Sequence, residues 1–266
     1  MEKLSLIRDR FKPIQPSVKD ENTISYTEFE PSVFLRNHIH CLWQLKTENT
    51  LVAPFNYRVV SDGCIDVFFD LNNTEDNFIM GFCKEFKEFP IGTKFNYVGI
   101  RFYPSIFPTL FKIAAKELSN SDIPLNHIEK DFSSFISNLQ NNNLEKSISK
   151  IDDYLTSIIK NSETTIDMRF FNAFIVILEA NGNIETESQL NTGLSPRQLR
   201  RMFNYYIGTT PKSFSLVVRF QHVLNKLINS KITNSGIFLD AGFYDQAHFI
   251  KNFSQFYGIS PMKVFL

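Results

Sequence analysis

The feature that most constrains this chain is an internal repeat near its C-terminal end. After one inserted residue the two copies keep an offset of fifty, so that Leu199 corresponds to Phe249, Phe203 to Phe253, Gly208 to Gly258 and Pro211 to Pro261. Each copy places a glycine where a tight turn needs left-handed backbone, followed by a residue that can cap a helix. The repeat therefore predicts two copies of one small helix–turn–helix unit.

Capping signals mark the second helix of each unit. Ser195 and Gln198 have the spacing of a capping box, and Pro196 occupies the first helical position, where a missing N–H has no cost. Asp245 caps the corresponding helix of the second copy. The polar sides of the two helices carry Arg197, Arg200 and Arg201 in the first copy, and Gln246, His248 and Lys251 in the second.

These polar sides suit double-stranded DNA. An α-helix fits the major groove of B-form DNA, where arginine can read guanine and glutamine can read adenine. Two such helices about 34 Å apart on one body would meet successive major grooves. The segment from Pro211 to about Ser230 predicts a helix of suitable length to hold them apart. A solvated helix face is the alternative for either helix alone, but the presence of two complete copies favours DNA.

The charge distribution agrees with this interpretation. The whole chain carries 28 basic and 28 acidic residues, yet residues 165–266 carry 10 basic and 6 acidic ones. From Ser195 onward there are nine basic residues, and the acids are Asp240 and Asp245. A basic end on a neutral chain attracts a polyanion to that end alone.

The first half of the sequence predicts β-strands rather than helices. Short aromatic and β-branched runs cover residues 38–43, 64–69, 77–82 and 95–102, with turn signals between them. Strands without regular intervening helices indicate an antiparallel sandwich or barrel. We therefore predict an α+β chain, with a β-rich sensor or dimerisation domain at 1–160 that ends in a helix, and an all-α domain at 165–266.

Two further helices are predicted near the junction of these domains. One spans residues 166–180. The other carries apolar residues at heptad spacing, which either pack on their own domain or pair with a second copy in a homodimer: Leu144, Ile148, Ile151, Leu155 and Ile158.

The stretch from about Gly182 to Leu266 resembles the C-terminal DNA-binding domain of the AraC/XylS family of bacterial transcription regulators. The residues that carry the likeness are Gly193-Leu194-Ser195-Pro196-Arg197-Gln198-Leu199, Phe203 with Gly208 and Pro211, Arg219-Phe220-Gln221, and Gly242-Phe243-Tyr244-Asp245-Gln246-Ala247-His248-Phe249 with Phe253 and Gly258-Ile259-Ser260-Pro261. The resemblance implies that the six polar residues named above contact bases or adjacent phosphates.

The N-terminal half is similar to the cupin-like sensor domain of one subgroup of these regulators. The similarity rests on Leu42-Trp43, Asp62-Gly63-Cys64, Ile100-Arg101-Phe102-Tyr103-Pro104 and Pro124-Leu125. It implies a β-rich fold in this half of the chain.

The sequence also departs from the family in the helix before each turn. Family members usually have a small alanine there, whereas this chain has Gln189 and Phe238. A bulky residue at a close helix crossing costs about 1–3 kcal/mol unless the neighbours repack. We expect these departures to affect DNA affinity more than the fold.

No catalytic constellation, phosphate-binding loop or cofactor motif is found, and we predict that the protein is not an enzyme and needs no cofactor. His38 and His40 lie at a spacing that metal ligands can use on a strand, but buried strand histidines explain them better, so no metal is predicted. Cys41, Cys64 and Cys83 are sparse and odd in number, which predicts reduced, buried thiols.

Charged residues within the predicted strands are candidates for a ligand pocket. Asp62, Asp66 and Asp70 are expected at the rim of such a pocket rather than in catalysis. Arg101 interrupts an apolar strand, where an outward-facing or salt-bridged side chain is favoured over an inward-facing one that anchors an acidic effector.

These expectations combine into one functional prediction. The sequence has no run of 18 apolar residues and no apolar signal core. We therefore expect no association with a membrane and place the protein in the cytoplasm. The predicted function is a sequence-specific transcription regulator whose residues 1–160 bind an effector or a protein partner. The alternative is a protein-interaction or small-ligand-binding module with a degenerate, weakly DNA-binding C-terminal domain.

Overall fold

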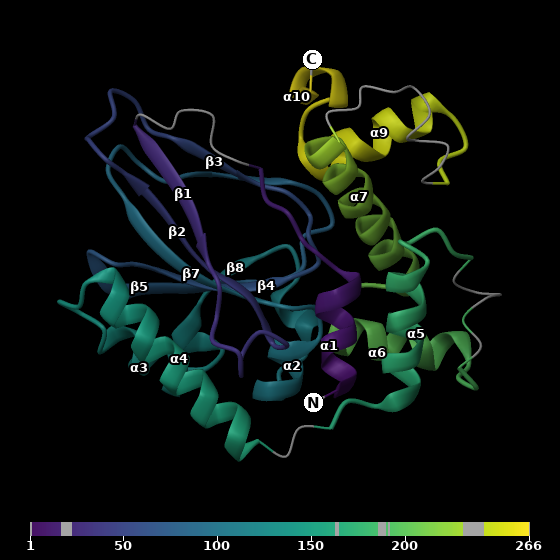
Figure 1. Ribbon diagram of the computed structural model, residues 1–266, viewed down its shortest axis with the longest axis horizontal. Coiled ribbons are helices and arrows are strands. Elements are labelled where there is room, and N and C mark those ends of the chain that lie inside the picture. The colour runs from purple at the N-terminus through teal and green to yellow at the C-terminus, as the bar shows by residue number, and fades with distance from the viewer. Residues whose placement is uncertain are drawn as a thin grey trace.

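The computed structural model describes residues 2–16, 23–162, 165–185, 190, 192–230 and 242–265, with strands in the first half and helices in the second (Figure 1). This arrangement confirms the predicted α+β fold class. The junction between the two predicted domains at residues 163–164 lies outside the described residues, as do Gln189 and Phe238. None of the described helices is long and apolar enough to span a bilayer.

The first half is built on an antiparallel sheet of six strands in the order β1-β2-β7-β4-β5-β8. The strands are β1 (Ile24–Phe29), β2 (Ile39–Thr47), β4 (Ile65–Asp70), β5 (Asn73–Met80), β7 (Asn96–Phe102) and β8 (Asp122–Pro124). Every neighbouring pair is antiparallel, as predicted. The four runs expected from the sequence correspond to β2, β4, β5 and β7.

A separate ribbon of two strands, β3 (Asn56–Val59) and β6 (Lys87–Pro90), belongs to the same domain. Side chains of the ribbon and of one sheet face form a largely aromatic core that includes Trp43 and Tyr57. Trp43 pairs across the strands with Gly99, and its indole occupies the space that a Cβ at Gly99 would need. Glycine at this position therefore makes room for the largest side chain of this core.

Helices cover other parts of the sheet (Figure 1). They are α2 (Ile106–Phe111), α3 (Lys130–Ser137) and α4 (Leu144–Asn161), with the short 3-10 turns η1 (Ala115–Leu118) and η2 (Leu125–His127). The predicted heptad stripe lies on α4, where Ile151 and Leu155 are fully buried in the core of the chain itself. Ile151 and Leu155 thus pack within their own chain, as in the first of the two alternatives, and pairing in a homodimer stays a prediction.

The second half consists of α5 (Met168–Glu179), α6 (Pro196–Tyr206), α7 (Pro211–Ser230), α9 (Gln246–Tyr257) and α10 (Pro261–Phe265). α5 and α7 confirm the helices predicted over 166–180 and 211–230. The N-terminal helix α1 (Glu2–Arg10) packs against α5, although it comes before the β domain in sequence (Figure 1).

One continuous hydrophobic core joins the two halves. Phe11, which follows α1, and Phe214 of α7 have ring centroids 6.4 Å apart, and Phe174 of α5 stacks on Phe214 at 5.3 Å. The same buried cluster contains Phe102 of the sheet and Phe253 of α9. Because burial of apolar surface is the main favourable term in folding, this core makes the two halves one body in this arrangement.

Gly99→Ala tests the packing of Trp43. The added methyl group meets the indole ring, so we expect the free energy of unfolding in urea to fall by about 1–3 kcal/mol. In a Trp43→Phe background the smaller ring leaves space, and the same substitution should cost clearly less. An equal cost in both backgrounds would show that the ring does not decide the choice of glycine.

Candidate functional site

The first candidate recognition helix is α6. The Ser195 hydroxyl accepts a hydrogen bond from the Gln198 amide at 3.3 Å, and the Gln198 side chain accepts one from the Ser195 amide at 3.0 Å. Both bonds of the predicted capping box are therefore present, with Pro196 at the start of the helix. Gly193 in the preceding turn has a φ of 67°, a conformation that favours glycine.

The second candidate helix, α9, starts in the corresponding way. The Asp245 carboxylate accepts a hydrogen bond from the His248 amide at 2.7 Å, which confirms the predicted cap. Gly242 in its turn has a φ of 77°. Each helix has a buried apolar face that packs against the core, with Phe203 on α6 and Phe253 on α9.

The six predicted contact residues are all exposed: Arg197, Arg200 and Arg201 on α6, and Gln246, His248 and Lys251 on α9. Within the part of the chain that the structure describes, the three arginines form no salt bridge. The His248 ring meets the edge of Phe243 at 5.6 Å, so it is partly engaged. The remaining basic groups are free to meet an anionic surface.

The helix α7 connects the two units through its Arg219-Phe220-Gln221 segment. Arg219 donates hydrogen bonds to the carbonyl oxygens of Gly182 and Gly242, each at 3.0 Å. It thereby ties the turn after α5 to the turn before α9. Phe220 is buried against Phe253 at 5.5 Å, which anchors α9 on α7.

The glycines that follow the two recognition helices both touch the β half. Gly208 has a φ of 92°, and a Cβ there would collide with Ser119 of the segment after η1. The Ser119 hydroxyl also donates a hydrogen bond to the Gly208 carbonyl at 2.7 Å. Gly258 has a φ of 94°, and a Cβ there would lie 2.7 Å from the Phe86 ring. The β half therefore contacts equivalent points of the repeat.

Backbone hydrogen bonds add to this contact at α9. The Ser61 amide donates to the carbonyl of Phe256 at 3.3 Å, and the Phe86 amide donates to the carbonyl of Gln255 at 3.2 Å. At the other unit, α6 packs against η1 and α2. The β half thus holds the C-terminal ends of both candidate recognition helices.

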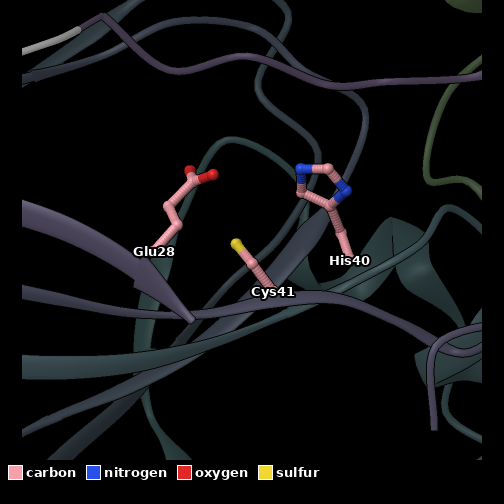
Figure 2. Close-up of side chains that lie close together, drawn as sticks. All are labelled: Glu28, His40 and Cys41. Atoms are coloured by element: carbon pink, nitrogen blue, oxygen red, sulfur yellow. The ribbon is translucent and has the colours of Figure 1, made fainter. Parts of the chain in front are cut away.

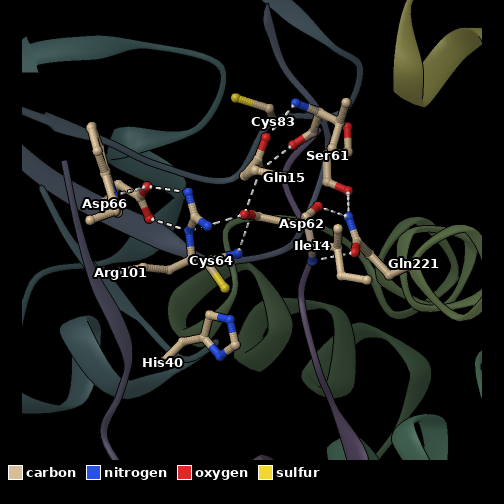
Figure 3. A network of polar contacts seen from close by, with 12 residues as sticks. Ile14, Gln15, His40, Ser61, Asp62, Cys64, Asp66, Cys83, Arg101 and Gln221 are labelled. Carbon is tan, nitrogen blue, oxygen red and sulfur yellow. Dashed lines mark hydrogen bonds and ion pairs between the residues drawn. The ribbon is translucent and has the colours of Figure 1, made fainter. Parts of the chain in front are cut away.

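A chain of buried polar groups runs from α7 into the β half (Figure 3). Gln221 accepts a hydrogen bond from the Ile14 amide at 2.8 Å and donates one to the Ser61 carbonyl at 2.8 Å. The Gln15 side chain donates to the Asp62 carboxylate at 2.7 Å. Asp62 is in turn 3.3 Å from the guanidinium of Arg101. Buried polar groups of this kind are costly when they are unpaired, so these hydrogen bonds hold the residues that form them in one arrangement.

Arg101 lies at the centre of this network, with 2% of its surface exposed. Asp66 accepts two hydrogen bonds from the guanidinium, at 3.1 and 2.9 Å, and a third from the Trp43 indole at 3.1 Å. Glu28 lies 3.5 Å away on another side. Burial raises the pKa of Asp66 to about 6, and the charge of Arg101 opposes that increase. Arg101 is therefore both inward-facing and salt-bridged, and its predicted role as an anchor for an acidic effector stays a prediction.

A cavity of about 210 Å³ opens beside Arg101 and Asp66. Most of its wall is apolar, and it is lined by Trp43, Tyr57, Val59, Phe68, Phe78, Met80, Phe89, Pro90, Ile91, Tyr97 and Asp122 together with those two residues. Of the three aspartates expected at a pocket rim, Asp66 lines the cavity, Asp62 lies behind it on Arg101, and Asp70 lies at the far end of β4.

Three potential metal ligands, Glu28, His40 and Cys41, also lie close together (Figure 2), with ligand atoms within 4.8 Å of one another. Two of them are otherwise engaged. Glu28 accepts a hydrogen bond from Tyr26 at 2.7 Å, and His40 Nδ1 lies 3.3 Å from the Tyr103 hydroxyl. Burial raises the pKa of the Cys41 thiol, which disfavours the thiolate that a metal needs. The absence of a bound metal stays a prediction.

All three cysteines are buried and free, as predicted. Burial also lowers the pKa of His38 to about 4 and that of His40 to about 3, with a further contribution at His40 from the charge of Arg101. Both rings are therefore neutral in the folded protein near pH 7.

Comparisons with known proteins identify the helical half. A helix-turn-helix domain model matches residues 191–265, which include α6, α7, α9 and α10. The C-terminal domain is an AraC-type helix-turn-helix domain. A second model, a domain of unknown function (DUF6597), matches residues 27–124, the strands that precede the AraC-type domain.

A relative named as a transcription regulator is similar to part of the chain. An uncharacterized HTH-type transcriptional regulator of Haemophilus influenzae is 35% identical over 98 residues, which is 36% of this chain. The match spans 33% of that protein, about a third of its length.

Solved structures of ToxT from Vibrio cholerae are also similar over most of the chain. The apo form of a ToxT variant has 9% identity and a TM-score of 0.41, with 91% of this chain and 96% of that chain covered. ToxT with a bound unsaturated fatty acid has 10% identity and a TM-score of 0.39, with 91% and 94% covered.

Several residues of the polar chain into the AraC-type domain were not found from the sequence. Gln221 belongs to a segment that was noticed only for its resemblance to the family, and its bonds to Ile14 and Ser61 bridge residues far apart in sequence. Gln15 has no sequence signal, since it lies in a short connecting segment after α1. Asp62 is a predicted rim carboxylate, but its pairing with Arg101 depends on how the segment before β4 lies against β7.

His40→Gln tests the effect of the neutral histidines on stability. The unfolded chain protonates a histidine near pH 6.5, whereas the folded protein resists protonation of His40 until about pH 3. The contribution of the neutral His40 ring to the free energy of unfolding is therefore complete above pH 6.5 and is lost as the pH falls. Between pH 6 and 4 the free energy of unfolding falls as the pH is lowered. This fall should be about 1.4 kcal/mol per pH unit smaller in the variant than in the unmodified protein. Identical pH dependence in urea unfolding would contradict this account.

Proposed function

We propose that this protein is a transcription regulator that binds double-stranded DNA through α6 and α9 and responds to an effector or partner at its β domain. The observation that carries the proposal is the exposure of all six polar residues on two helices whose opposite faces are packed. The match of residues 191–265 to a helix-turn-helix domain supports it. The buried free thiols are compatible with a reducing compartment, and we place the protein in the cytoplasm.

The length of α7 is compatible with contact of α6 and α9 with two major grooves. α7 has 20 residues and joins the two units, and such a helix is about 30 Å long. Successive major grooves on one face of DNA are about 34 Å apart. A single chain carries both recognition helices, so this mode of binding needs no second subunit.

We further propose that the β domain controls how α6 and α9 are presented. The contacts at Gly208 and Gly258 lie at equivalent positions of the two units, and Gln221 connects α7 to the segment that holds Asp62. A change at Arg101 or Asp66 therefore has a short route of buried hydrogen bonds to the helix that separates the two units. Regulation by a ligand then requires only that it favour one arrangement of these contacts over another.

DNA binding across a salt series tests the main proposal. The full chain should bind a DNA sequence selected from a random pool, with affinity that falls steeply as salt rises, because cationic side chains release counterions from the phosphates. Selected DNA should bind at least about 10³-fold more tightly than scrambled DNA. Equal affinity for both would favour the alternative, a ligand-binding or protein-interaction module with a degenerate C-terminal domain.

Arg200→Ala tests the first recognition helix. Loss of a base contact should cost about 1–3 kcal/mol of discrimination at one base pair, with little change at other positions. Lys150→Ala, at an exposed position of α4 in the β half, is the matched control and should leave both affinity and preference unchanged. If Arg200→Ala behaves like the control, α6 does not read bases through this residue.

Gln221→Ala tests the control by the β domain. Loss of its hydrogen bonds should loosen the contact with α9, so the amides of Ser61 and Phe86 should exchange hydrogen faster, although Gln221 is bonded to the carbonyl of Ser61 and not to either amide. Lys226→Ala, on the exposed side of the same helix, is the control and should leave both amides protected. Unchanged protection in Gln221→Ala would mean that the contacts are independent of one another.

A further inference from the structure

The cavity beside Arg101 is large enough for a two-ring organic molecule. An apolar protein cavity of about 150 Å³ binds benzene, and this one measures about 210 Å³. It lies between the β3–β6 ribbon and the sheet, where Tyr57, Phe89 and Pro90 come from the ribbon and Trp43 and Phe68 from the sheet. Both sides of the pocket are therefore fixed by strand pairing.

Aromatic rings form much of the cavity wall. Six of the lining residues are aromatic: Trp43, Tyr57, Phe68, Phe78, Phe89 and Tyr97. Several of these rings support one another, since Phe68 lies 6.3 Å from Trp43, 5.7 Å from Phe78 and 6.2 Å from Tyr97. Ring faces attract flat apolar molecules, and they also attract cations through the negative charge of their π-systems.

The charged residues at the cavity are mainly acidic. Among the described lining residues, Asp66 and Asp122 are acidic and Arg101 is the single cation. Arg101 is already paired with Asp66 and has two further carboxylates nearby, those of Asp62 at 3.3 Å and Glu28 at 3.5 Å. A ligand carboxylate would be one more anion around a guanidinium whose charge is already compensated. A positively charged ligand would meet a surplus of carboxylates.

We propose that the cavity is a binding site for small aromatic molecules that carry a positive charge, such as an arylalkylammonium ion. The rings of the ligand enter between the ribbon and the sheet. The positive charge of the ligand is stabilised by the faces of the lining aromatic rings and by the carboxylates of Asp66 and Asp122. The role of such a ligand as an effector rests on the proposed function, because Arg101 and Asp62 connect the cavity to Gln221. Binding itself does not depend on DNA.

The test uses the full chain at pH 7 without DNA and three probes with the same two rings: biphenyl-4-ylmethyl-trimethylammonium, biphenyl-4-ylmethanol and biphenyl-4-carboxylate. Trp43 is the single tryptophan of the protein and lines the cavity, so its fluorescence reports binding, and calorimetry measures the same affinities independently. We expect the ammonium probe to bind at least tenfold more tightly than the alcohol, and the carboxylate to bind most weakly.

Three results would overturn the proposal: no saturable binding of the ammonium probe by either method, equal affinities for the ammonium and the alcohol, or tightest binding of the carboxylate. The last of these would instead support Arg101 as an anchor for an acidic effector. Because no DNA is present, each result is independent of whether the AraC-type domain reads a sequence.

Variants then locate the site. Asp122→Asn changes an exposed carboxylate and leaves the Arg101 cluster intact, so it should weaken binding of the ammonium probe several-fold without affecting binding of the alcohol. Ile91→Tyr fills the cavity from a partly exposed position and should weaken binding of both probes. Glu145→Gln, which removes an exposed carboxylate on α4, is the control. If Asp122→Asn and Glu145→Gln give the same affinity for the ammonium probe and Ile91→Tyr binds it normally, the probe binds elsewhere and the proposal fails.

Discussion

The structure depends on one apolar contact surface, the aromatic core shared by the β domain and the helices. Phe11 and Phe214 meet across it, and the cluster extends from Phe102 in the sheet to Phe253 in α9. Because this core is continuous, neither half buries its apolar surface fully without the other. The two helix–turn–helix units are therefore held against the β domain rather than linked to it by a tether.

Buried polar groups give this apolar contact a defined geometry. Apolar packing tolerates small shifts, whereas the hydrogen bonds of Gln221 and the close approach of Phe86 to Gly258 each require one relative position. The same polar groups reach Asp62 and Arg101 at the cavity. The residues that fix the arrangement of the domains are therefore also those that a ligand in the cavity would disturb.

The sequence predicted the elements that depend on local patterns. The caps at Ser195 and Asp245, the second helix of each copy of the repeat and the strands are encoded within short segments, and the structure confirms them. Residues 186–189 and 231–241, where the first helix of each copy is predicted, lie outside the described residues. The sequence did not reveal the contacts between distant segments. Gln221 meets residues more than 150 positions away, and the three carboxylates around Arg101 come from β1, from β4 and from the segment before β4. The chain has 28 phenylalanines, and the rings of many of them form the core that the two domains share.

The central claim is that one chain places two helices in successive major grooves, and methylation interference tests it most directly. Methylation of guanine N7 blocks contacts in the major groove without altering the minor groove edge. On DNA selected by the full chain, we expect two groups of interfering guanines whose centres lie about one helical turn, roughly 10 base pairs, apart. A single group, or interference scattered along the DNA, would contradict it.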